Sequence, residues 1–79
     1  MNQKTYNDVI SGKSDNNINF NDFRNLIVDL GFSFIRQNGS HIQYYHKDIN
    51  ERMTIQNANS KAKGYQVRQL RNIIVKHSL

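Results

Sequence analysis

Apolar residues recur along the chain with two different periods, and the longer period marks two helices. Between residues 18 and 30 they fall every three to four positions, as on one helix face: Ile18, Phe20, Phe23, Leu26, Ile27 and Leu30. Asn19 or Asn21 can cap the start of this helix, and Gly31 can end it in the left-handed conformation. A second stripe predicts a closing helix: Val67, Leu70, Ile73, Ile74 and His77. We expect both stripes to face the core.

Three short segments between the two stripes have the β-branched and aromatic residues that are typical of strands. They are FSFIRQ (32–37), HIQYYH (41–46) and RMTIQN (52–57). The Asn-Gly pair at 38 and 39 predicts a hairpin turn, and KDIN (47–50) predicts the second turn. The three strands therefore form an antiparallel meander, followed by a polar and basic loop (58–64).

The order of these elements predicts an α+β fold of the α-β-β-β-α type. Two helices on one face of a three-stranded antiparallel sheet bury both apolar stripes and leave the other face open. A short helix between Thr5 and Ile10, closed by Gly12, precedes them. Because 79 residues suffice for only one domain, we expect a single domain (1–79) with an N-terminal helix and loop (1–17) and a core (18–79).

The alternation in the middle strand decides where its first histidine points. Ile42 and Tyr44 share one face of that strand, whereas His41, Gln43 and Tyr45 share the other. If Ile42 and Tyr44 face the core, His41 faces solvent beside a glycine-containing turn. An imidazole in this position can take or give a proton near neutral pH.

Positive charge is concentrated in the last third of the chain. The formal net charge is +5, but residues 1–51 carry five basic and six acidic side chains, and the charged residues after them are all basic: Arg52, Lys61, Lys63, Arg68, Arg71 and Lys76. A one-sided positive surface attracts a polyanion, and a nucleic-acid backbone is the simplest such partner. The alternative is a basic surface without a partner of its own.

The composition argues against several other classes of protein. The chain has no cysteine, which removes disulfides, thiolate zinc sites and cysteine nucleophiles. No apolar run approaches the roughly 20 residues of a membrane span, and the start has no apolar signal-peptide segment, so we expect a cytoplasmic protein without membrane contact. His41 and His46 should lie on opposite strand faces, with His77 at the inner boundary of the last helix, so we expect no metal site and no cofactor.

These features favour RNA cleavage without a metal ion. The carboxylates form no cluster that would hold Mg²⁺, since Asp48 and Glu51 lie in a turn and the others are scattered. His41 would instead remove the proton of a ribose 2′-hydroxyl, which then attacks its own phosphodiester. Nearby cations would offset the charge that develops on the phosphate, with Lys61, Lys63 and Arg68 as candidates. An exposed strand histidine without a catalytic role is the alternative.

Tyr45 and Gln43 share the predicted face of His41 and extend the candidate site along the strand. Their side chains could stack on a base or hydrogen-bond to it. A tyrosine that only covers the sheet surface is the alternative.

The segment FIRQNGSHIQYYH (34–46) resembles the signature of the HicA toxin family, in which an Arg-Gln-x-Gly-Ser-His sequence opens the second strand. LRNIIVKHSL (70–79) is similar to the closing helix of that family, and the resemblance covers about residues 18–79. It implies a double-stranded-RNA-binding-like fold and a ribonuclease toxin that cuts mRNA and halts translation. It also implies a HicB antitoxin that masks the active face.

By position, the catalytic histidine of the HicA family falls on His41. The resemblance places Arg36, Gln37 and Ser40 in the same signature, and together with the charge pattern it gives this set of expected RNA-binding residues: Arg36, Gln37, Ser40, Tyr45, Lys61, Lys63, Arg68 and Arg71. The leading hypothesis is therefore an mRNA endonuclease with a HicB-type antitoxin as its protein partner. A module of the same fold that binds RNA without cutting it is the first alternative. An antitoxin-bound or DNA-binding regulator that works through partners alone is the second.

Overall fold

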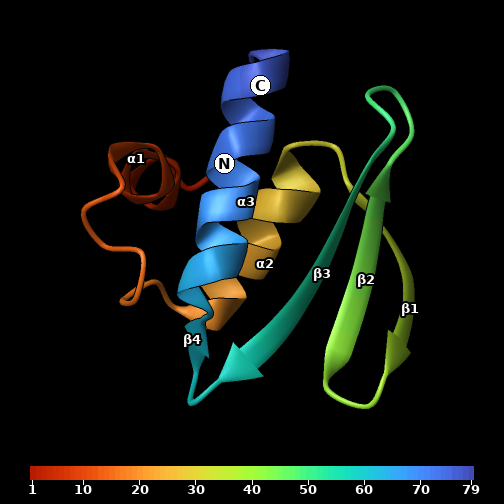
Figure 1. Cartoon of the computed structure of the whole chain (residues 1–79), viewed down its shortest axis with the longest axis horizontal. Coiled ribbons are helices and arrows are strands. Elements are labelled where there is room, and N and C mark those ends of the chain that lie inside the picture. The colour runs from red at the N-terminus through yellow and green to blue at the C-terminus, as the bar shows by residue number, and fades with distance from the viewer.

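The computed structural model describes all 79 residues as three helices and a four-stranded antiparallel sheet. The elements follow in the order α1 (Gln3–Ser11), α2 (Phe20–Asp29), β1 (Ser33–Asn38), β2 (His41–His46), β3 (Glu51–Ala58), β4 (Lys61–Ala62) and α3 (Gly64–His77). The strands lie side by side in sequence order, and α2 and α3 run along one face of the sheet (Figure 1). The predicted α+β arrangement is confirmed.

The second helix begins and ends where its local signals predicted. The Asn19 side chain accepts a hydrogen bond from the backbone N–H of Asp22 at 3.0 Å, which caps the first turn. Gly31 follows the last residues of the helix with a φ of 109°. That angle suits glycine, and a β-carbon here would also meet the ring of His46 directly.

The loop predicted at residues 58–64 is different in the structure, because it contains the two-residue strand β4. Asn57 pairs with Ala62 and Ala58 pairs with Lys61. Asn59 and Ser60 form the turn, with φ angles of 54° and 69°. Two positive φ angles match the twist of an antiparallel hairpin, but here they occur without the glycine that normally signals such a turn.

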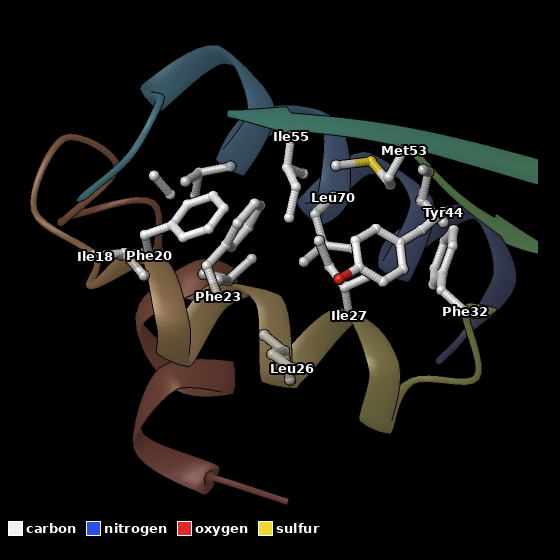
Figure 2. Close-up of a cluster of buried hydrophobic side chains, with 14 of the residues drawn as sticks. Ile18, Phe20, Phe23, Leu26, Ile27, Phe32, Tyr44, Met53, Ile55 and Leu70 are labelled. Atoms are coloured by element: carbon white, nitrogen blue, oxygen red, sulfur yellow. The ribbon is translucent and has the colours of Figure 1, made fainter. Parts of the chain in front are cut away.

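The core fills the layer between the helices and the sheet (Figure 2). Sixteen buried apolar residues form one cluster, to which α2 contributes Phe23 and Ile27, α3 contributes Leu70, and β3 contributes Met53 and Ile55. Ile42 and Tyr44 of β2 are buried in the same cluster. The apolar side of β2 is therefore turned toward the helices, as predicted. None of the helices has the length and apolar run needed to cross a membrane.

The N-terminal helix α1 packs on the side of α3 that faces away from the sheet (Figure 1). Arg71 of α3 holds this contact together. Its guanidinium donates to both carboxylate oxygens of Asp15, at 2.8 and 3.1 Å, and to the backbone oxygen of Val9 at 3.1 Å. The Tyr6 hydroxyl also donates to the backbone oxygen of Leu79 at 2.9 Å. The segment before α2 is thus fastened to the last helix.

Candidate active site on the open sheet face

The face of the sheet turned away from α2 and α3, here called the open face, carries three rows of polar side chains. Residues that pair directly across antiparallel strands point to the same side, so the register defines each row. From one end of the sheet to the other, the rows are Asn38–His41–Gln56, Arg36–Gln43–Thr54 and Ser33–Tyr45–Arg52. His41, Gln43 and Tyr45 therefore share this face, as the alternation predicted.

His41 is exposed and stands at the first position of β2, directly after the hairpin turn. The turn residues are Gly39 and Ser40, one position later than predicted, because Asn38 still belongs to β1. A β-carbon placed on Gly39 would meet no atom within 4 Å. The turn beside the exposed His41 is therefore uncovered at Gly39, which leaves room for a bulky polymer substrate.

The neighbours of His41 on the open face are neutral hydrogen-bonding groups. Gln56 lies opposite His41 on β3, and its amide nitrogen donates to the Ser40 hydroxyl at 3.2 Å. Asn38 lies opposite on β1. The bond between Gln56 and Ser40 joins β3 to the turn that leads into His41, so it helps to fix the start of β2.

A buried glutamine anchors this end of β3 to α3. Gln66 is 1% exposed, and its side-chain oxygen accepts a hydrogen bond from the backbone N–H of Gln56 at 3.1 Å. That N–H lies beyond the end of β4 and has no strand partner there, because β4 pairs only with Asn57 and Ala58. Gln66 supplies the missing acceptor. The strand residue opposite His41 is therefore held from behind by the helix.

Basic side chains collect at the same end of the sheet as His41. The β1–β2 turn, the last residues of β3, β4 and the first turn of α3 all lie there (Figure 1). Lys61 is exposed on β4 and donates to the side-chain oxygen of Asn17 at 2.7 Å, which leaves its charge uncompensated. Lys63 precedes α3, and Arg68 is exposed one turn into that helix. Because neighbouring strands are about 4.8 Å apart, β4 lies roughly 10 Å from β2.

Two residues expected to bind RNA are engaged elsewhere in the structure. The guanidinium of Arg71 is held by Asp15 and Val9 between α1 and α3, away from the sheet. This partnership lowers the pKa of the Asp15 carboxyl, chiefly through the hydrogen bond from Arg71. Gln37 pairs with Ile42, which points toward the helices, and its amide donates to the backbone oxygen of Gly39 at 3.1 Å. The sequence did not reveal either engagement.

The three histidines occupy separate environments. His46 is buried on the helix side of β2, where its Nε2 lies 3.0 Å from the backbone oxygen of Leu30 and its ring meets Phe32 edge-on. His77 lies at the end of α3, where its Nε2 is 2.8 Å from a carboxylate oxygen of Glu51. That contact lowers the pKa of Glu51. His41 is thus the one histidine on the open face.

The far end of the open face carries two further groups, one of which the sequence did not single out. Tyr45 pairs with Arg52 of β3, and the guanidinium carbon of Arg52 lies 5.2 Å from the centre of the tyrosine ring. The Tyr45 hydroxyl donates to the side-chain oxygen of Asn50 at 2.8 Å. Alternation in β3 places Arg52 and Gln56 on this face, and cross-strand register, which the sequence alone does not give, sets them opposite Tyr45 and His41.

An α+β fold with a histidine at the start of the second strand and an open polar sheet face is the arrangement expected of a HicA-type toxin. The family model described as HicA toxin of bacterial toxin–antitoxin matches residues 20–76, which is more than half of the chain. The chain therefore belongs to the HicA toxin family. Comparison with curated proteins gave no match. Comparison with solved structures gave none either.

Proposed function

We propose that this protein is an mRNA endonuclease that inhibits translation and that uses His41 to cut RNA without a metal ion. The observation that carries the proposal is the placement of His41. Its imidazole is exposed at the start of β2, the turn beside it is uncovered at Gly39, and it lies at the end of the sheet where Lys61 and Lys63 collect. Membership of the HicA toxin family supports the same conclusion.

The proposed roles follow from the chemistry of the groups on the open face. His41 accepts the proton of a ribose 2′-hydroxyl, and the resulting oxygen bonds to the adjacent phosphorus. The bond from phosphorus to the 5′-oxygen breaks, which leaves a 2′,3′-cyclic phosphate and a 5′-hydroxyl that takes its proton from solvent. Lys61, Lys63 and Arg68 bind flanking phosphates and offset the negative charge of the crowded phosphate. Ser40, Arg36 and Tyr45 contact the RNA along the strands. Arg71 and Gln37 are left out of this set, because Asp15 and the β1–β2 turn engage them.

The absence of the 2′-hydroxyl from DNA gives this mechanism its selectivity for RNA. The side chains that flank His41 across the strands, Asn38 and Gln56, are neutral, and the nearest carboxylates in sequence, Asp48 and Glu51, lie at the opposite end of β2. A proton-transfer mechanism uses the groups that are present around His41. We further propose that the protein acts in the cytoplasm, where its mRNA substrate is found, and that a HicB-type antitoxin neutralises it by covering the open face.

His41→Ala tests the proposal directly. A positioned general base contributes about 10²- to 10⁴-fold to a rate, so this variant should lose cleavage of a long single-stranded RNA by that factor. An exposed strand residue carries little stability, so the variant should unfold at the wild-type denaturant concentration. His77→Ala is the matched control, because it removes an imidazole that lies away from the open face.

Growth of cells that express each variant supplies the second measurement. The wild-type protein and His77→Ala should arrest growth, and His41→Ala should not. A folded His41→Ala protein that cleaves RNA at the wild-type rate would exclude the assignment. A wild-type protein that binds RNA but never cuts it would instead be an RNA-binding module of the same fold.

A further inference from the structure

The Tyr45–Arg52 pair, at the far end of the open face from His41, has no structural partner that accounts for its charge. The Arg52 guanidinium lies over the Tyr45 ring and takes part in none of the four ion pairs of the protein. Its neighbour Glu51 is engaged by His77 and Lys76 of α3. The pair therefore offers an uncompensated planar cation.

The tyrosine of this pair is held in a defined orientation. Its hydroxyl donates to Asn50 at the β2–β3 turn, its ring is half-buried, and the exposed Arg52 guanidinium lies over it. A ring and a guanidinium plane fixed in this way are the surfaces on which unpaired RNA bases stack. The guanidinium can also donate two hydrogen bonds to a phosphate.

The position of the pair relates it to His41. Tyr45 and His41 both belong to β2, where they lie four residues apart and on the same face. Four residues of a strand span about 13 Å. That length corresponds to about four nucleotides of an RNA strand stacked at roughly 3.4 Å per nucleotide, and to fewer of an extended strand. Arg36 and Gln43 lie in the row between the two ends.

We propose that the Tyr45–Arg52 pair is a nucleotide-binding subsite. It holds one base of the same single-stranded RNA whose phosphodiester lies at His41, two to four nucleotides away from the cut. Stacking on the pair would position the strand across the open face, and would make the protein prefer unpaired RNA of a minimum length. This inference rests on the proposed function, because it takes His41 to mark the bond that is cut.

The experiment measures binding of fluorescent single-stranded RNA to variants made in the His41→Ala protein. An RNA of twelve nucleotides and a series shortened one nucleotide at a time from either end are compared. Arg52→Ala should bind the longest RNA about 5- to 150-fold more weakly, the loss expected for one stacked base. The loss should vanish once the RNA is too short to reach the pair. Arg52→Lys should bind more tightly than Arg52→Ala but more weakly than the parent, because lysine keeps the positive charge and lacks the planar guanidinium.

Arg24→Ala is the matched control. Arg24 also lies over an aromatic ring, that of Phe20 at 6.0 Å, but it belongs to α2 on the other side of the sheet. The Arg24→Ala variant should bind every RNA of the series with the affinity of the His41→Ala protein in which it is made. If Arg52→Ala matched Arg24→Ala at all lengths, or weakened all lengths by one factor, the subsite would be excluded. Cleavage by the wild-type protein is measured separately, so a protein that binds as expected but does not cut would overturn only the proposed function.

Discussion

The side-chain oxygen of Gln66, buried in α3, accepts a hydrogen bond from the backbone N–H of Gln56 at 3.1 Å, in the strand residue that lies opposite His41. This contact joins the helical layer to the open face at the row that carries the imidazole. A second hydrogen bond extends this link, because the side-chain amide of Gln56 donates to the Ser40 hydroxyl in the turn before β2. Two hydrogen bonds therefore link a buried position in a helix to the residue that precedes His41.

Gln66→Leu should destabilise the protein, because it removes the acceptor of the part-buried N–H of Gln56. The expected loss in the free energy of unfolding is about 1–3 kcal/mol. Urea denaturation followed by circular dichroism measures it. Gln69→Leu is the control, since Gln69 is an exposed glutamine on the same helix. Equal denaturation midpoints for the two variants would show that the Gln66 bond contributes nothing.

Asp15→Asn should destabilise the protein in a pH-dependent way. Arg71 lowers the pKa of Asp15, so the ion pair contributes its full stability above the ordinary aspartate pKa of 3.8 and loses it as the pH falls through the lower folded-state pKa. At pH 7 the variant should be less stable than the wild type by about 1.5–3 kcal/mol, the usual range for a charged hydrogen bond. The difference should shrink below pH 3.8.

Urea denaturation at pH 7 and at pH 2.5 measures this difference. Asp48→Asn removes the same charge from an exposed turn and serves as the control. A gap between wild type and Asp15→Asn that persists unchanged at pH 2.5 would contradict the electrostatic account. It would point instead to packing of the asparagine itself.

Lys61→Ala combined with Lys63→Ala should weaken RNA binding and flatten its dependence on salt. Each phosphate contact to a single strand adds about 0.7 to the slope of log affinity against log salt concentration, so the loss of both contacts should lower the slope by about 1.4. Affinities measured in the His41→Ala protein at several salt concentrations between about 50 and 200 mM test this, because phosphate contacts weaken strongly over that range.

The control for the lysine experiment is Lys4→Ala combined with Lys76→Ala. These lysines pair with Asp8 and Glu51, so the control makes the same change in net charge at compensated positions. An equal change of slope in both double variants would show that only the total charge of the protein matters. A change confined to the first would locate the phosphate contacts beside β4.

Most of the fold could be predicted because its signals are local. The stripe on α2, its Asn19 cap and Gly31 lie within one segment, and the alternation in β2 placed His41 on the open face without further information. The strand β4 was missed because its turn uses Asn59 and Ser60 rather than glycine. A two-residue strand also leaves no visible alternation in the sequence.

The rest of the candidate site depends on contacts between distant segments. Gln56 and Arg52 lie opposite His41 and Tyr45 because of the register between β2 and β3, which the intervening turn sets. Arg71 looked like part of a basic face, but its partner Asp15 is 56 residues away in the sequence. Gln66 lies on the inward side of α3 beside Val67, and a single glutamine in a helix does not reveal that it is buried.

Cleavage should need no divalent metal and should leave a 2′,3′-cyclic phosphate or the 3′-phosphate formed from it. In the proposed reaction His41 removes the 2′-hydroxyl proton, so the nucleophile comes from the RNA itself. A metal-bound water would instead attack from outside, and it would not need the 2′-hydroxyl. Digestion of one RNA in excess EDTA, and of the same RNA carrying 2′-O-methyl groups, separates the two. We expect full activity with EDTA and none on the methylated RNA. Activity that stops with EDTA, or cutting that survives methylation, would exclude the 2′-hydroxyl mechanism even if the protein arrests growth.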